Sequence, residues 1–237
     1  MRQEENALDV TVILPCRDEA ATVAESVAAA LRFIREQGLN GEVLVVDNGS
    51  TDGSGALALT SGARVVREET PGYGAALRRG IRASCGRVIL MLDADLTYDF
   101  SDLEKLYRPL AAGRFDMMIG DRFSGGIEPG AMPPSHHIGV RALSAFGRWR
   151  FHTDVRDFHC GLRGLTAESV KKLKLSATGM EFATEMIAEA ALAGLKIGQT
   201  PVRLRRCPKK RKPKLRTIRD GFRHLFLILC VHTTGLA

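Results

Sequence analysis

The chain has 237 residues, 45% of them hydrophobic and 26% charged, which excludes a wholly disordered protein and suffices for one large domain or a domain with an appendage. The formal net charge of +7 is unevenly distributed, because residues 203–223 carry 11 Lys or Arg and one acid, a charge of +10, while the remainder carries −3. This distribution argues against a nucleic-acid surface spread over the whole fold and indicates one local anionic partner.

Short apolar runs alternate with helical periodicity over the first 120 residues. The runs predict strands, which cover residues 10–14, 43–46, 64–66, 88–92 and 117–119. Helices are predicted between them over residues 19–37, 74–84 and 101–110, the last opened by a capping box of Ser101 and Glu104. Strands that alternate with helices at this pace predict an α/β protein with a mostly parallel, doubly wound sheet and flanking helices.

The pattern changes after residue 120. Residues 120–135 are rich in Gly and Pro and predict a long loop. Amphipathic helices are predicted over 138–150 and 181–194, with an irregular segment between them, and residues 196–204 predict a last strand. We therefore divide the chain into a domain of residues 1–202 and a basic tail of residues 203–237, which contains an amphipathic helix over about 215–231.

The cysteines and the apolar runs bear on location. The five cysteines are widely spaced and include no C-x-x-C pair, so we expect no disulfide framework and no cysteine zinc site, which fits a reducing cytosol. The first ten residues lack the apolar stretch of a secretory signal. The longest apolar run, Leu225–Val231, is far shorter than the roughly 20 residues of a spanning helix. We expect a cytoplasmic protein without a membrane-spanning segment.

Acidic residues directly follow two of the predicted strands. Asp47 ends the second strand, and Asp93-Ala-Asp95 follows the fourth. Ligands of parallel α/β sheets bind beyond the carboxyl ends of the strands, so these acids are expected at one rim. Asp93 and Asp95 can reach one divalent cation, and their hard oxygen atoms suit Mg²⁺ or Mn²⁺ bridging a diphosphate. The alternative interpretation is a pair of solvated turn acids.

Other residues border the same rim. Asp47 can accept a hydrogen bond from a base N–H or a ribose hydroxyl, and Glu19 is either a first-turn helix acid or a nucleotide ligand. Gly72 and Gly74 form a turn that opens a helix, where backbone can approach phosphate closely. Their spacing departs from G-x-G-x-x-G, which disfavours a dinucleotide fold.

The motifs in combination resemble one enzyme family. In order they are VILPCRDEA, VLVVDNGSTDGS, GYGAALRRGI, MLDADLTYDF, IGDRF, DFHCGLRGL and GMEFATEM. Over about residues 10–225 the chain resembles the inverting, GT-A-fold glycosyltransferases of family 2, the group of the dolichyl-phosphate mannose and glucose synthases and their bacterial polyprenyl-phosphate relatives. The resemblance implies metal-dependent transfer of a hexose from a UDP- or GDP-sugar to a polyprenyl phosphate at the cytoplasmic membrane face.

The resemblance also implies roles on the donor side. Three positions that hold the nucleoside of the sugar nucleotide are matched by Pro15, Glu19 and Asp47. Asp93 and Asp95 match the acids that hold the metal ion and the diphosphate.

On the acceptor side, Arg122 matches an arginine that meets the acceptor phosphate. Asp157 and Arg163 match the segment beside the donor sugar, and Glu185 matches an acid on the helix that faces the site. Thr97 departs from the family, since many relatives carry Gln there as a metal ligand. A phosphate acceptor is already an anion and needs no strong base, whereas a hydroxyl acceptor would need one, with Asp157 or Glu185 as candidates.

The basic tail has three interpretations: a solvated charge run, a nucleic-acid segment, or a contact with an anionic membrane surface. Arg203–Arg223 lacks interleaved aromatic residues, so we expect no nucleic acid. An apolar face alternates with arginines in the helix that follows, and its members are Leu215, Ile218, Phe222, Leu225 and Leu229. This pattern is typical of an interfacial helix, and we expect it to bind an anionic membrane.

Two alternatives to this function stay open. One is the same chemistry on a small soluble acceptor, as in natural-product or saccharide assembly, and the other is a non-catalytic binding module with a basic tail. The donor also stays open, because nothing in the sequence separates UDP-glucose, UDP-N-acetylglucosamine and GDP-mannose.

Overall fold

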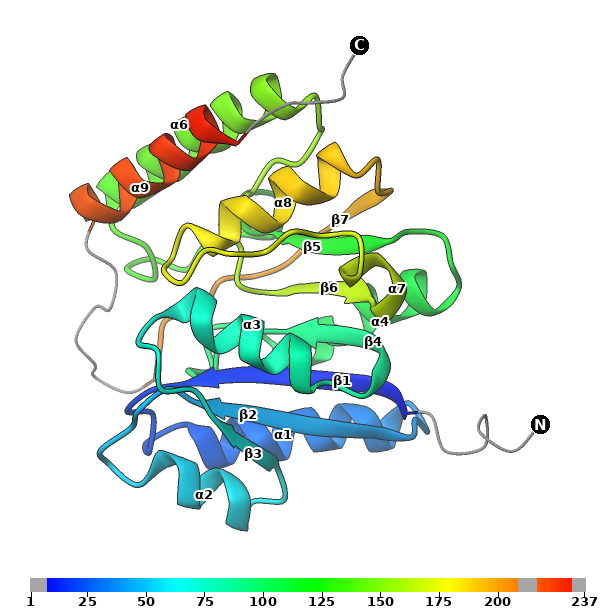
Figure 1. Cartoon of the computed structure of the whole chain (residues 1–237). Helices are drawn as coiled ribbons and strands as arrows, with labels where there is room; N and C mark the ends of the chain where they lie inside the picture. Colours follow the sequence, from blue (N-terminus) through cyan, green and yellow to red (C-terminus); the bar gives the residue numbers. More distant parts are fainter. Residues whose placement is uncertain (1–7, 209–216, 232–237) are drawn as a thin grey trace.

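One sheet organises the chain, whose computed structural model describes residues 8–208 and 217–231. The strand order is β3-β2-β1-β4-β6-β5-β7, with helices on both faces (Figure 1). The strands are β1 (Leu8–Cys16), β2 (Gly41–Asp47), β3 (Arg64–Arg67), β4 (Gly86–Met91), β5 (Met117–Asp121), β6 (Arg163–Thr166) and β7 (Ile197–Pro201). The parallel pairs β1–β2, β1–β4, β2–β3 and β5–β7 confirm the predicted mostly parallel α/β sheet.

The exception is β6, which is antiparallel to both β4 and β5 and lies where an irregular segment was predicted. It has only four residues, and one of them is Gly164, so it shows no apolar alternation. A side chain at Gly164 would meet the side chain of Leu90 at 2.6 Å and that of Leu110 at 3.0 Å. The strand therefore fits between its neighbours only because this residue is glycine.

Ten helical elements flank the sheet in the two described ranges. They are α1 (Val23–Glu36), α2 (Ser54–Thr60), α3 (Tyr73–Ala83), the 3₁₀ turn η1 (Phe100–Asp102), α4 (Leu103–Ala111), α5 (Arg122–Gly125), α6 (Pro134–Phe151), α7 (Ala167–Val170), α8 (Phe182–Leu192) and α9 (Thr217–Cys230). In the part of the chain that the structure describes, no helix is both long enough and apolar enough to cross a bilayer.

Several predicted helix boundaries were wrong. The capping box of Ser101 and Glu104 does not form, because the Asp99 side chain caps the turn by accepting from the Ser101 backbone N–H at 3.0 Å. Glu104 instead pairs with Arg108 at 2.6 Å. The predicted loop of residues 120–135 contains α5 and the start of α6, which begins at Pro134, a residue suited to a first helical position.

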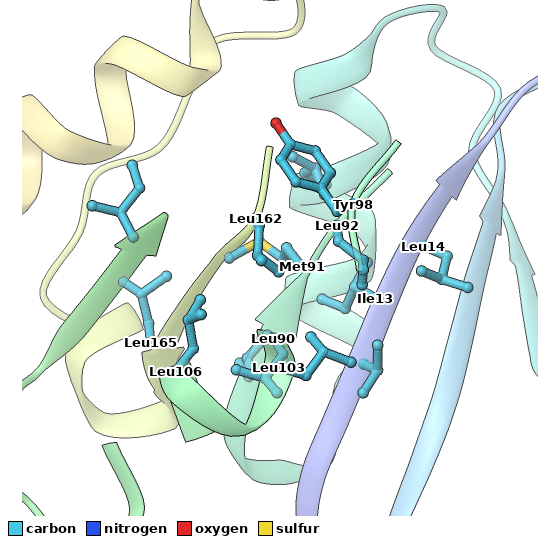
Figure 2. Packing of buried hydrophobic residues seen from close by; sticks show 14 of the residues in the cluster. Ile13, Leu14, Leu90, Met91, Leu92, Tyr98, Leu103, Leu106, Leu162 and Leu165 are labelled. Carbon is cyan, nitrogen blue, oxygen red and sulfur yellow. The ribbon is translucent and has the colours of Figure 1, made fainter. Parts of the chain in front are cut away.

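The hydrophobic core lies on both faces of the central strands. Figure 2 shows Leu90 and Met91 of β4 packed among Ile13 of β1 and leucines of other elements. Tyr98 packs on the upper end of this cluster, and its hydroxyl points away from it (Figure 2). The core thus holds the carboxyl end of β4 in place. Asp93 and Asp95 follow directly after this end in the sequence.

Truncation of the core should destabilise the fold. We expect Leu90→Ala to lower the free energy of unfolding by about 2–5 kcal/mol, because Leu90 is fully buried and leaves a cavity between β4 and β6. Leu59→Ala is the control, since this α2 side chain is 62% exposed and its loss should cost less than about 0.5 kcal/mol. Equal effects in urea unfolding would contradict this packing.

Candidate active site

The carboxyl ends of β1 and β2 form the first corner of the site. Cys16 and Asp47 face each other in the register of these strands, and half-buried Pro15 precedes Cys16. Glu19 follows in the next turn, where its backbone N–H donates to Ser54 Oγ at 2.8 Å. Burial raises the pKa of the Cys16 thiol to about 11, and the charges of Asp47 and Glu19 add to this shift. The corner therefore brings together the three residues predicted to hold a nucleoside.

The second corner lies one strand away, past β4. Asp95 is buried, and its Oδ1 accepts from the Thr97 backbone N–H at 3.0 Å and from Thr97 Oγ1 at 2.5 Å. Asp93 lies beside Tyr73 of α3; burial raises the pKa of this tyrosine well above its usual range, and the Asp93 charge adds to the shift. On the other side, a side chain at Gly161 would lie 2.6 Å from Asp93 Oδ2.

This second corner fits a divalent cation that arrives with a diphosphate. Mg²⁺ in proteins is commonly held by one or two carboxylates together with substrate phosphates and water. Asp93 and Asp95 supply two hard carboxylates, and within residues 8–208 and 217–231 no group of three or more His, Cys, Asp or Glu is placed to hold a metal. Two carboxylates are compatible with a cation that is also held by substrate phosphates, and Thr97 orients Asp95.

The segment of residues 157–163 closes the site on the side of α8. The Gly161 backbone N–H donates to the Tyr98 hydroxyl at 3.0 Å, which is the hydroxyl that points out of the core in Figure 2. Sequence reasoning missed Tyr98, and the only available signal was an aromatic residue three positions after Asp95. The hydrogen bond between Gly161 and the Tyr98 hydroxyl fixes the distance between this segment and the end of β4.

An ion pair anchors the start of this segment. Arg122, the first residue of α5, donates from Nε and Nη2 to the two oxygens of Asp157 at 2.6 and 2.8 Å. The side chains are 9% and 0% exposed, so this pair lies inside the protein. The structure therefore brings the predicted acceptor arginine and Asp157 together, with Asp157 using two of the donors of Arg122.

Arg163 and Glu185, two predicted site residues, lie inside the protein. The guanidinium of Arg163 is fully buried and donates to the carbonyls of Cys160, Phe158 and Ala183, which ties the segment to α8. The Glu185 carboxylate accepts from Ser176 and from the Ala177 backbone N–H. In this structure both side chains hold the scaffold around the site.

The glycine-rich turn has a different physical reason from the predicted one. A side chain at Gly72 would lie 2.1 Å from the Thr178 carbonyl, and one at Gly74 would lie 2.6 Å from the Ala177 carbonyl. The backbone N–H groups of Gly74 and Ala75 donate to the carbonyls of residues 179 and 178. The backbone N–H groups of this turn, which were predicted to lie near a phosphate, are therefore already hydrogen-bonded to carbonyl groups of the protein.

Sequence reasoning also missed a cavity of about 970 Å³ beside α6, at the carboxyl ends of β5 and β7. Three arginines and two aspartates line it, so the arginines are in excess by one charge: Arg141, Arg148, Arg156, Asp121 and Asp154. The Arg141 guanidinium also lies 5.1 Å from the ring centroid of Phe123, in the helix that carries Arg122. A cationic cavity therefore adjoins the Arg122–Asp157 pair.

The comparisons with known proteins agree with this geometry. The sequence profile of glycosyl transferase family 2 matches residues 11–173. The low-salt glycan biosynthesis hexosyltransferase Agl6 of Haloferax volcanii is 35% identical over 221 residues, which are 93% of this chain and 53% of that protein. Glycosyltransferase AglJ of the same organism is 35% identical over 213 residues, 90% of this chain and 68% of AglJ. This chain thus spans about half the length of Agl6 and about two thirds of AglJ.

A solved structure shows the same architecture. Glucosyl-3-phosphoglycerate synthase from Mycobacterium tuberculosis, in complex with Mn²⁺, UDP-glucose and phosphoglyceric acid, superposes with a TM-score of 0.74 at 25% identity, covering 94% of this chain and 78% of that one. This chain thus has the GT-A fold, with a mostly parallel sheet and acidic residues after its central strands. The chain belongs to glycosyl transferase family 2.

Removal of Asp157 should leave a buried, unpaired arginine. We expect Asp157→Ala to lower the free energy of unfolding by about 3–5 kcal/mol, the usual cost of breaking a buried ion pair from one side. Asp154→Ala is the matched control, because this acid precedes the same segment but is exposed. A destabilisation below about 1 kcal/mol in denaturant unfolding would show that Arg122 reaches water without its partner.

Proposed function

We propose that this chain transfers a hexose from a UDP- or GDP-sugar, with Mg²⁺ or Mn²⁺, to an acceptor phosphate with inversion at the anomeric carbon. The observation that carries the proposal is the convergence at the end of β4. There Asp93 lies between Tyr73 of α3 and Gly161 of the 157–163 segment, and the buried Asp95 follows two residues later, hydrogen-bonded to Thr97. The solved relative that contains Mn²⁺ and UDP-glucose supports the choice of metal and donor class.

The donor occupies both corners of the rim in this proposal. Pro15, Glu19 and Asp47 hold the nucleoside, because they surround the ends of β1 and β2. Asp93 and Asp95 hold the metal-bound diphosphate, where the cation supplies charge neutralisation of the leaving group. Thr97 keeps one Asp95 oxygen occupied and so fixes the direction of the other.

The acceptor approaches from the side of Arg122. A guanidinium has five N–H donors, and Asp157 accepts from Nε and from Nη2, so donors remain for an acceptor phosphate. A phosphate oxygen is already anionic near neutral pH, and its attack opposite the diphosphate needs positioning rather than a general base. Arg163 and Glu185 contribute by holding the 157–163 segment and the 176–177 turn.

The proposed acceptor is a polyprenyl phosphate at the cytoplasmic face of a membrane. Large apolar side chains that are more than half exposed support it: Ile138 and Trp149 on α6, and Phe222, Phe226 and Leu229 on α9. These helices are in contact with each other and lie side by side at one end of the molecule (Figure 1). The cytoplasmic side is supported by the cysteines, all five of which are free.

The basic tail supports the same acceptor by its charge and its position. The Arg205 backbone N–H donates to the Thr97 carbonyl at 2.8 Å, two residues from Asp95. Near an anionic membrane each Lys or Arg contributes about 1 kcal/mol of attraction. Residues 209–216, with Leu215 and Arg216 of the predicted interfacial pattern, lie outside the described residues, as does the side chain of Ile218.

A small soluble acceptor with a phosphate group is the second candidate. The arginine-lined cavity beside α6 favours it, as does the phosphoglyceric acid in the complex of the solved relative. Phosphoglyceric acid carries a hydroxyl as well as a phosphate, so a soluble acceptor could react through either group, and a hydroxyl would need a general base. The two candidates also differ in the isoprenoid chain, which only the exposed face of α6 and α9 would bind.

A transfer assay tests the proposed reaction. Radiolabelled UDP-glucose, UDP-N-acetylglucosamine and GDP-mannose are offered separately with Mn²⁺ and a polyprenyl phosphate in detergent. We expect one donor to give label in the organic phase and EDTA to abolish it. Label from no donor, but metal-dependent release of UDP or GDP with a phosphorylated soluble acceptor, would favour the second candidate.

Loss of a metal-binding carboxylate should abolish this turnover. We expect Asp95→Ala to lower transfer by at least about 10³-fold, since charge on the leaving diphosphate is no longer neutralised, while circular dichroism shows a folded protein. Glu36→Ala, an exposed acid at the far end of α1, should transfer normally. Mn²⁺-dependent turnover by folded Asp95→Ala would refute the assignment.

Flotation with liposomes tests the membrane surface. Wild-type protein should float with vesicles that contain anionic lipid, and Phe222→Ser/Phe226→Ser should reduce the bound fraction at least about fivefold, because two aromatic contacts are lost. The control is Leu57→Ser/Leu59→Ser, which changes two exposed leucines on α2 at the other end of the sheet. Equal flotation of both variants would contradict a role for α9.

A further inference from the structure

The helix α9 contacts the rest of the protein through a largely polar face. Its buried side chains at intervals of four are Asp220, His224 and Ile228. Its exposed side chains include Phe222 and Phe226. An ordinary surface helix turns a mainly apolar face inward, whereas α9 buries two polar side chains beside Ile228, which belongs to the hydrophobic core. The attachment of α9 therefore depends on specific polar contacts as well as on apolar burial.

The central contact is made by two histidines and a threonine. His224 Nδ1 lies 2.7 Å from Thr184 Oγ1 of α8, and His159 Nε2 lies 3.4 Å from the same oxygen. The two imidazole rings meet edge to face, with centroids 4.4 Å apart. His159 Nδ1 is buried and has no hydrogen-bond partner in the part of the chain that the structure describes. His159 is thus held mainly by His224 and Thr184.

His159 belongs to the segment that borders the metal acids. Its backbone N–H donates to Asp157 Oδ1 at 3.1 Å, and Asp157 holds Arg122. Two residues further along, Gly161 lies against Asp93 and donates to Tyr98. One short segment therefore touches α9 through the ring of His159 and the donor site through Gly161.

Burial disfavours the charged form of both rings. Burial lowers the pKa of His159 well below its usual value, and His224, Arg122 and Arg163 lower it further. Burial also lowers the pKa of His224 to about 4, although Glu181 and Asp220 oppose the shift while Arg163 and Arg223 add to it. The contact is consequently a hydrogen-bonded and aromatic one at neutral pH, and it requires close approach of α9.

We propose that His224 is a positioning residue that couples α9 to the donor site, by holding His159 and thereby the 157–163 segment against Asp93. The inference rests on the proposed donor site at Asp93 and adds a means by which an acceptor-side helix controls it. Coupling between two sites is reciprocal, so donor binding must also order α9. Binding of α9 to the proposed membrane surface then favours the position of the 157–163 segment in which the protein binds the nucleotide donor.

Hydrogen exchange and calorimetry on the full chain test the coupling. UDP with Mn²⁺, and GDP with Mn²⁺, are titrated into the protein, and amide exchange of residues 217–231 is measured with and without the nucleotide that binds. We expect nucleotide to slow exchange in α9 of the wild type. In His224→Ala this slowing should vanish, and the Kd for the nucleotide should rise about fivefold or more.

Three variants separate positioning from a general loss of structure. Cys230→Ser, a nearly isosteric change of an exposed side chain at the end of α9, should behave as wild type. His224→Asn presents an amide near the position of Nδ1 and should restore part of the response. Thr184→Val removes the shared hydroxyl with little change of shape and should reproduce the loss, which keeps the test valid if His224→Ala does not fold.

The outcomes distinguish this inference from the proposed function. If neither nucleotide binds with Mn²⁺, the donor site at Asp93 is refuted and the coupling with it. If a nucleotide binds while α9 exchange is unchanged, or if His224→Ala binds as tightly as wild type and keeps the response, the donor site stands and the coupling is refuted.

Discussion

The site depends on how closely residues 157–163 approach the end of β4. Gly161 makes that approach possible, because any side chain there would meet the Asp93 carboxylate at 2.6 Å. The Tyr98 hydroxyl accepts a hydrogen bond from Gly161 and so sets the distance between this segment and the end of β4. The ring of Tyr98 is held in the core. Everything else proposed for the site follows from this contact, since it brings a segment from beyond α6 against the acids of the first half of the chain.

Two buried arginines hold that segment at a substantial electrostatic cost. Arg122 is compensated by the carboxylate of Asp157, and Arg163 by backbone carbonyls and by Met186 Sδ. A buried ion pair is weak evidence for net stability, because desolvation offsets most of its attraction. Its value here is geometric, because the two parallel hydrogen bonds fix the Arg122 guanidinium against the start of the 157–163 segment.

Most of the sheet could be predicted from the sequence, because β1, β2 and β4 each contain a run of three or four consecutive apolar residues. The acids past these strands could be predicted for the same reason. The strand β6 and the roles of Arg163, Glu185 and the 72–74 turn could not, because they depend on contacts between distant residues, such as Gly72 against the Thr178 carbonyl. The apolar pattern of α9 agrees with the exposed position of Phe222, but no sequence pattern reveals that the helix turns His224 inward.

We propose that this member of glycosyl transferase family 2 joins a hexose to an acceptor phosphate with inversion. Nuclear magnetic resonance of the product made from an α-linked nucleotide sugar tests this reaction most directly. We expect a new phosphodiester ³¹P resonance and a β-configured anomeric carbon. An α-linked product would contradict inversion, and release of nucleotide without a sugar–phosphate bond to the acceptor would contradict the proposed reaction.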